Sequence, residues 1–288
     1  MAPDLPISLE HVSVDTGQVR LHVVLAGPDN GLPVVLLHGF PEFWYGWSSQ
    51  IAPLANAGFR VIVPDQRGYN LSEKPRPVRA YRMSNLTADI LAVLDHQQVQ
   101  SANVVGHDWG AAVGWHLAMR HPGRVDRLAI LNVPHPAVMR LHLRSSFRQL
   151  LRSWYIFFFQ VPWLPDLLLR TGGLVRLLQA SSKRNTFSEA DLEQYRAAWR
   201  QPGAVSAMLG WYRAAMRYPS EVFQDRRISM PALILWGARD VALDLGMAEA
   251  SLGWCDEGRL EVFPRATHWV QHDEAAAVNH SLIDFLTG

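Results

Sequence analysis

The chain has 288 residues, with 27 Lys and Arg against 26 Asp and Glu, and it carries one cysteine. Near-neutral charge argues against a nucleic-acid-binding protein, which would show a basic excess, and a single cysteine rules out an internal disulfide. The length suits one large domain or a core with an inserted lid. The first ten residues lack the basic start and apolar run of a secretory signal, so a cytoplasmic location is the default expectation.

Short aliphatic runs predict the strands of the core. Such runs, separated by segments with helical spacing, are typical of a parallel sheet covered on both faces. In a sheet of this kind the functional residues lie at the carboxyl ends of the strands. The predicted strands are residues 34–37, 61–63, 103–105, 128–133, 232–236 and 260–263.

The strand pattern stops between residues 137 and 227, where Leu, Arg, Trp and Ala recur with helical spacing. This interruption predicts a helical cap inserted late in a mostly parallel α/β sheet that is flanked by helices. The most apolar stretch, residues 154–169, is interrupted by two prolines and an aspartate and is too short to span a bilayer, so we expect buried helix or pocket wall and no integral membrane contact. The predicted parts are core residues 1–137, cap residues 138–227 and core residues 228–288.

A glycine-flanked aspartate follows the third of these strands. The segment Gly106-His107-Asp108-Trp109-Gly110 precedes a helical run, which is the context of a nucleophile elbow. The usual pattern is G-x-S-x-G, and here Asp108 takes the central place. The alternative is an ordinary glycine-rich turn with a capping aspartate.

Two further residues follow strands in the order expected of a catalytic triad. Asp240 comes after the strand that ends in Trp-Gly, and His268 comes after the last strand. The order nucleophile, acid, histidine is typical of α/β-hydrolases. Asp244 is a nearby competitor for the acid role and ranks below Asp240. His107 fits packing better than catalysis, because His268 already takes the position of the base.

The first predicted strand ends at His38-Gly39-Phe40-Pro41. A loop at this place donates a backbone N–H to the oxyanion hole in such a fold, together with the residue after the nucleophile. The two donors are then Phe40 and Trp109. A plain Gly-Pro turn is the alternative.

Six segments resemble the epoxide hydrolases of the α/β-hydrolase fold, and the resemblance extends over nearly the whole chain, cap included. The pair HGFP and GHDWG is specific to epoxide hydrolases and their dehalogenase relatives. The segments are HGFPEFWYGW (38–47), PDQRGYNLSEKP (64–75), GHDWGAAVGWHLA (106–118), NVPHP (132–136), WGARD (236–240) and ATHW (266–269).

The resemblance implies hydrolysis of a small lipophilic epoxide by water, without a cofactor. A carboxylate that attacks a saturated carbon forms an alkyl ester, which divides one hard step into two. His268, oriented by Asp240, then activates water to attack the ester of Asp108. By analogy with the family, Tyr155 and Tyr212 of the cap bind the epoxide oxygen and supply its proton. For either tyrosine, a packed aromatic with a surface hydroxyl is the alternative.

Two other functions stay open. A hydrolytic dehalogenase would use the Trp109 indole as a halide donor, but haloalkane dehalogenases have Asn or Glu where Phe40 stands. Fluoroacetate dehalogenases have arginines where Trp109 and Ala112 stand. A non-catalytic hydrolase-fold binding protein would have no need to keep all three triad residues.

The pocket walls are expected to be apolar and aromatic. The expected substrate-binding residues are His38, Pro41, Trp44, Trp47 and His135, beside Phe40 and Trp109.

Four arginines recur every fourth residue at the start of the cap, which predicts a solvated helix face. No motif for a metal or a nucleotide occurs, so neither is expected. No nucleic-acid partner is expected either, and the protein is expected to be a monomer or a homodimer. The four arginines are Arg140, Arg144, Arg148 and Arg152.

Overall fold

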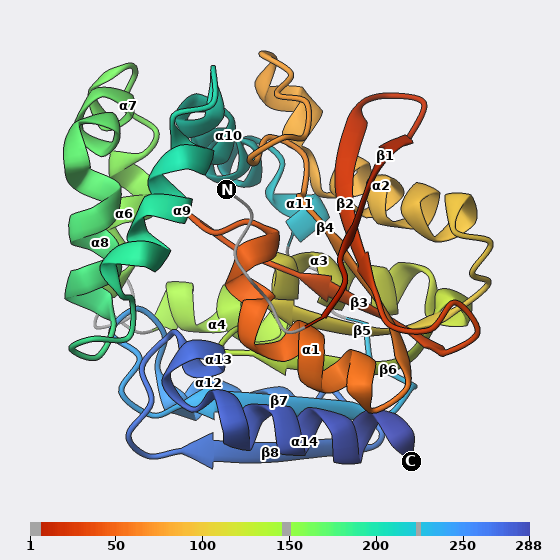
Figure 1. Cartoon of the computed structure of the whole chain (residues 1–288). Coiled ribbons are helices and arrows are strands. Elements are labelled where there is room, and N and C mark those ends of the chain that lie inside the picture. Colours follow the sequence, from red (N-terminus) through yellow and green to blue (C-terminus); the bar gives the residue numbers. More distant parts are fainter. Residues whose placement is uncertain (1–6, 146–150, 223–225) are drawn as a thin grey trace.

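The computed structural model describes residues 7–145, 151–222 and 226–288 (Figure 1). In this part of the chain one sheet of eight strands forms, in the order β1-β2-β4-β3-β5-β6-β7-β8. In this order the last six strands, β4-β3-β5-β6-β7-β8, run parallel to one another. This confirms the predicted α/β fold with a mostly parallel sheet. The strands are β1 (Glu10–Asp15), β2 (Arg20–Ala26), β3 (Leu32–Leu37), β4 (Phe59–Pro64), β5 (Ala102–His107), β6 (Val125–Leu131), β7 (Ala232–Gly237) and β8 (Gly258–Phe263).

The first two strands were not predicted. β1 and β2 form an antiparallel hairpin, and β2 pairs antiparallel with β4. The outermost strand β1 alternates mostly exposed positions with one buried residue, Val14, so it lacks the continuous apolar run of a strand covered on both faces. A search for such runs therefore finds β3 to β8 and misses the hairpin at the edge.

Helices cover both faces of the sheet (Figure 1). On one face, the strand residues Leu36 and Leu235 share an apolar cluster with α1 (Ser48–Asn56), α13 (Val270–Asp273) and α14 (Ala275–Thr287). On the other face, Leu37 and Ile234 pack with the second set of helices. That set is α2 (Met83–His96), α3 (Trp109–Arg120) and α12 (Leu245–Leu252).

Between β6 and β7 the described chain is helical, and we call these helices the cap. In Figure 1, residues 154–217 of the cap form the green to teal group beside the sheet. No helix in the described ranges is long and apolar enough to cross a bilayer. The cap helices are α4 (Pro136–Ser145), α6 (Trp154–Phe158), α7 (Leu164–Leu168), α8 (Leu174–Ser181), α9 (Glu189–Trp199), α10 (Ala204–Arg217) and α11 (Pro219–Val222).

The apolar stretch 154–169 is only partly buried, so the prediction of buried helix or pocket wall was wrong for part of it. Phe159 is buried and Tyr155 lines a pocket, whereas Trp163 is 72% exposed and Leu167 is 52% exposed. The stretch breaks into α6 and α7, and a helix of five residues turns one side toward the core and the other to solvent.

Of the four arginines predicted to form a solvated helix face, one is exposed and another forms an ion pair. Arg144 is exposed on α4, and Arg152 forms an ion pair with Asp244 at 3.3 Å. Arg148 lies outside the described residues. Asp244 also caps α12 through the N–H of Gly246, and the aspartate that contacts Nδ1 of His268 is Asp240.

Candidate active site

The sharp turn at Asp108 presents its side chain at the carboxyl end of β5. Its backbone adopts φ 49° and ψ −123°, and α3 begins at the next residue. Glycines permit this turn, because a Cβ on Gly106 would come within 2.6 Å of the Gly110 carbonyl oxygen and one on Gly110 would come within 2.0 Å of the Leu37 carbonyl oxygen. Such a backbone costs about 1–3 kcal/mol and is typical of functional residues.

The two carboxylate oxygens of Asp108 have different partners. Oδ1 accepts the backbone N–H of Phe40 at 2.7 Å, while Oδ2 lies 3.5 Å from Nε2 of His268. Burial alone would raise the pKa of Asp108, but the hydrogen bond and charge of His268 and the Phe40 amide lower this pKa below its usual value. The carboxylate is therefore ionised at neutral pH, with Oδ1 held and Oδ2 facing the histidine.

His268 is oriented by Asp240. Its Nδ1 lies 2.7 Å from Oδ2 of Asp240, and the other oxygen of Asp240 accepts the N–H groups of Ala242 and Leu243 at 2.7 and 2.9 Å. Burial lowers the pKa of His268, but the charges of Asp240 and Asp108 outweigh it and raise the pKa to about 10. In the free site the ring is therefore an imidazolium between two carboxylates.

Asn132 is a site residue that the sequence reasoning missed. Its Nδ2 donates to Oδ2 of Asp240 at 2.8 Å, and its Oδ1 accepts the N–H of Gly237 at 2.8 Å. The residue has φ 52°, a conformation that asparagine tolerates better than most residues. Its position directly after β6, in the NVPHP segment, was the feature of the sequence that could have indicated a site residue.

A cavity of about 610 Å³ brings five predicted residues together: Phe40, Asp108, Tyr155, Tyr212 and His268 all line it. Tyr155 comes from α6 and Tyr212 from α10, with ring centroids 6.0 Å apart. Burial, and then the charge of Asp108, raise the pKa of both tyrosines, so both hydroxyls keep their protons at neutral pH. The rest of the described lining is Leu151, Arg152, Trp154, Leu177, Ala180, Ser181, Val241, Ala242 and Leu243.

Three residues expected in the pocket wall pack elsewhere. Trp44 and Trp47 are buried on the α1 side of the sheet, at 4% and 0% exposure, because the turn that contains them is covered by that apolar cluster. His135 stacks on Trp254 with centroids 4.9 Å apart, and its Nε2 lies 3.0 Å from the carbonyl oxygen of Arg226. These three side chains are absent from the described lining of the cavity.

His38, Pro41 and Trp109 contact other parts of the protein. His38 is fully buried, and its Nε2 accepts the N–H of Gln66 at 3.0 Å. The carbonyl of Pro41 accepts the indole N–H of Trp199 at 2.6 Å. The indole of Trp109 packs against the ring of Tyr212, with centroids 5.0 Å apart. None of these three side chains is part of the described cavity lining.

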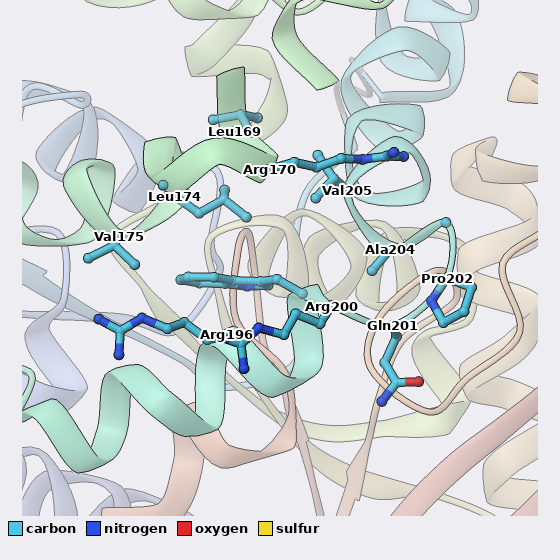
Figure 2. A pocket seen from close by; sticks show the side chains of 13 residues that line it. Leu169, Arg170, Leu174, Val175, Arg196, Arg200, Gln201, Pro202, Ala204 and Val205 are labelled. Atoms are coloured by element: carbon cyan, nitrogen blue, oxygen red, sulfur yellow. The ribbon is translucent and has the colours of Figure 1, made fainter. Parts of the chain in front are cut away.

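A second hollow, of about 480 Å³, lies within the cap (Figure 2). In Figure 2 the side chains of Arg196 and Arg200 lie below those of Leu174 and Val175. The described residues that line it include Trp199 but none of the predicted catalytic residues. The hollow is therefore separate from the Asp108 cavity.

Comparison with known proteins identifies the class of this fold and site. Residues 33–275 match the family model described as alpha/beta hydrolase fold. The chain belongs to this family, and it is a hydrolase.

Individual proteins of known sequence or structure are similar to this chain over nearly its whole length. The chain is 42% identical to AB hydrolase superfamily protein YfhM of Bacillus subtilis, over 95% of this chain and 96% of that one. It is 33% identical to Epoxide hydrolase A of Mycobacterium tuberculosis, over 96% of both chains. The structure of a mutant epoxide hydrolase from Bacillus megaterium matches 97% of this chain and 100% of its own, with a TM-score of 0.88 and 29% identity.

Proposed function

We propose that the protein hydrolyses lipophilic epoxides to vicinal diols through an ester on Asp108. One observation carries this proposal. An ionised aspartate, held by an amide on one oxygen and facing a histidine with the other, lines the same cavity as two protonated tyrosines. The relatives named epoxide hydrolases support the same reaction.

In the first step, Oδ2 of Asp108 attacks an epoxide carbon. The new bond joins Oδ2 to that carbon, the carbon–oxygen bond of the epoxide breaks, and its electron pair passes to the epoxide oxygen. Tyr155 and Tyr212 hydrogen-bond this oxygen, and one hydroxyl transfers its proton as the alkoxide develops. Because Oδ1 stays on the Phe40 amide, Oδ2, which faces His268, is the nucleophile.

In the second step, the ester is hydrolysed. Esterification removes the negative charge of Asp108, so the pKa of His268 falls and the ring gives up its proton, which passes through solvent to the deprotonated tyrosine. The neutral ring then takes a proton from water, whose oxygen attacks Cγ of the ester. The charge that develops on Oδ1 is held by the amide of Phe40 and by that of Trp109. Collapse breaks the bond between Cγ and the alkyl oxygen, which takes the proton from His268 as the diol leaves, and the new carboxyl group returns a proton to the ring.

The dehalogenase alternative is less well supported by the cavity. A departing halide needs N–H donors, and the donor expected for it was the indole of Trp109. That indole packs against Trp211 and Tyr212 and is not part of the described lining. The two tyrosine hydroxyls suit a developing alkoxide instead.

The proposed function predicts a clear substrate preference. The protein should convert styrene oxide to its diol, and it should release no bromide from a 1-bromoalkane of similar size. Diol is measured by chromatography and bromide by a halide assay, with an Asp108→Asn variant as the blank for both. Bromide release without diol formation would replace this proposal with the dehalogenase.

The two steps should differ in their dependence on pH. The first step needs ionised Asp108, whose pKa lies below its usual value of 3.8, so its rate should stay level from pH 8 down to about 5. The second step needs neutral His268, so its rate should rise with pH until the pKa of the ring in the ester is passed. Rapid-quench mass spectrometry should thus find more ester at low pH. Ester hydrolysis that is independent of pH would contradict the role of His268.

A further inference from the structure

Two side chains of the cap helix α9 hold the loop that carries the Phe40 amide. We call residues 38–42 the oxyanion loop. The hydroxyl of Tyr195 donates to Oε1 of Glu42 at 2.7 Å, and the indole N–H of Trp199 donates to the carbonyl of Pro41 at 2.6 Å. Tyr195 and Trp199 are four residues apart, so they lie on the same face of α9, and their rings stack with centroids 5.7 Å apart.

Glu42, which accepts the hydrogen bond from Tyr195, is itself buried and held by several side chains. Its side chain is 1% exposed, and its oxygens lie 2.7 Å from Nε2 of His272 and 3.1 Å from Nε2 of Gln271. Burial alone would raise the pKa of Glu42, but His272 and His107 lower it far below its usual value. The carboxylate that accepts the Tyr195 proton is therefore charged, and hydrogen bonds to charged acceptors are about twice as strong as neutral ones.

Glu42 is also connected to His268, through the ring of His107. Nδ1 of His107 lies 3.3 Å from Glu42, and its Nε2 lies 2.9 Å from the backbone carbonyl of His268. The rings of His107 and His268 are 4.7 Å apart at their centroids. Glu42 thus joins α9, the oxyanion loop and the main chain of His268 in one buried set of contacts.

We propose that Tyr195 and Trp199 are positioning residues for the reaction, and that they keep the Phe40 amide aligned on Oδ1 of Asp108 by holding the oxyanion loop at Glu42 and Pro41. This inference rests on the proposed function. Neither side chain lines the Asp108 cavity in the described structure, so each acts through the loop and not by touching the substrate.

The two chemical steps respond differently to a loosened loop. In the first step negative charge leaves Asp108, so the Phe40 hydrogen bond stabilises the starting state more than the transition state, and its weakening does not slow the reaction. In the second step charge develops on Oδ1, and the same hydrogen bond lowers the barrier. A loop that has moved therefore slows ester hydrolysis selectively.

The test uses Trp199→Phe, which removes the N–H and keeps an aromatic ring, and Tyr195→Phe, which removes only the hydroxyl. Rapid-quench mass spectrometry with styrene oxide measures ester formation and ester hydrolysis separately. We expect hydrolysis to fall about 10-fold in each variant, less than the roughly 10²-fold for a lost oxyanion donor, with ester formation unslowed. Ester should accumulate in both.

Tyr45→Phe is the matched control. The hydroxyl of Tyr45 donates to Asp191 of α9 at 2.7 Å, so this variant also loses a bond to the same cap helix but does not touch the oxyanion loop. Both of its rates should equal those of the unchanged protein.

Three results would overturn the inference: unchanged hydrolysis in both test variants, an equal fall in the two rates, or the same effect in Tyr45→Phe. Should Trp199→Phe fail to fold, as judged by circular dichroism, Tyr195→Phe decides alone, since it keeps every carbon of the side chain. No ester in the unchanged protein would instead overturn the proposed function, and this inference with it.

Discussion

His268→Gln is expected to stop the reaction at the ester of Asp108. Glutamine fills much of the space of the ring but cannot take a proton from water, and loss of a general base slows a step by about 10²–10⁴-fold. The first step needs only ionised Asp108 and should continue. Intact mass spectrometry after exposure to styrene oxide should then show one adduct per chain, with the mass of one substrate.

The control for this trapping experiment is the double variant with Asp108→Asn. Its amide is a poor nucleophile, so no adduct should form even though the cavity keeps its shape. An adduct that persists in the double variant would locate the ester elsewhere. Turnover of His268→Gln at the full rate would show that the histidine is not the base.

Replacing both cavity tyrosines, Tyr155→Phe with Tyr212→Phe, should nearly abolish epoxide opening. Each hydroxyl stabilises the alkoxide at the transition state, and removal of one such donor costs about 10²–10³-fold. Each single variant should keep measurable activity, because the other hydroxyl still donates. Single-turnover ester formation is the quantity to measure, since it isolates the step in which the proton is transferred.

Tyr218→Phe provides the comparison for these variants. Tyr218 follows α10, the helix that carries Tyr212, but it lies outside the described lining of the cavity, with the Arg82 guanidinium over its ring. Its replacement should leave ester formation unchanged. A double cavity variant that opens epoxides as fast as Tyr218→Phe would remove the tyrosines from the mechanism.

The parallel part of the fold and the meeting of Asp108, Asp240 and His268 at one edge of the sheet could be predicted, because both depend on local pattern. Continuous apolar runs mark strands covered on both faces, and polar residues directly after such runs meet at one edge of the sheet. Asp108, Asp240 and His268 each follow a strand, and the structure places His268 between the two aspartates, 2.7 Å from Asp240 and 3.5 Å from Asp108.

Other parts of the site depend on contacts that local pattern does not reveal. Asn132 reaches Asp240 across 108 positions of sequence, and Trp199 reaches Pro41 across 158. The tryptophan-rich run after the oxyanion loop looked like pocket wall, but Trp44 and Trp47 turn into the core on the other side. Which face an aromatic side chain takes is decided by the layer that covers it, and Trp154 of the cap lines the cavity instead.

The place where the cap leaves the sheet bears on how such enzymes diverge. The chain departs after β6 and returns at β7, and near these two junctions Nε2 of His135 lies 3.0 Å from the carbonyl oxygen of Arg226. An insertion whose two ends almost touch can be exchanged between relatives through two adjacent junctions, with the elbow and the histidine untouched. Such a transplanted cap would change which epoxides fit, and under the positioning role that we propose for Tyr195 and Trp199 it would need equivalents of both.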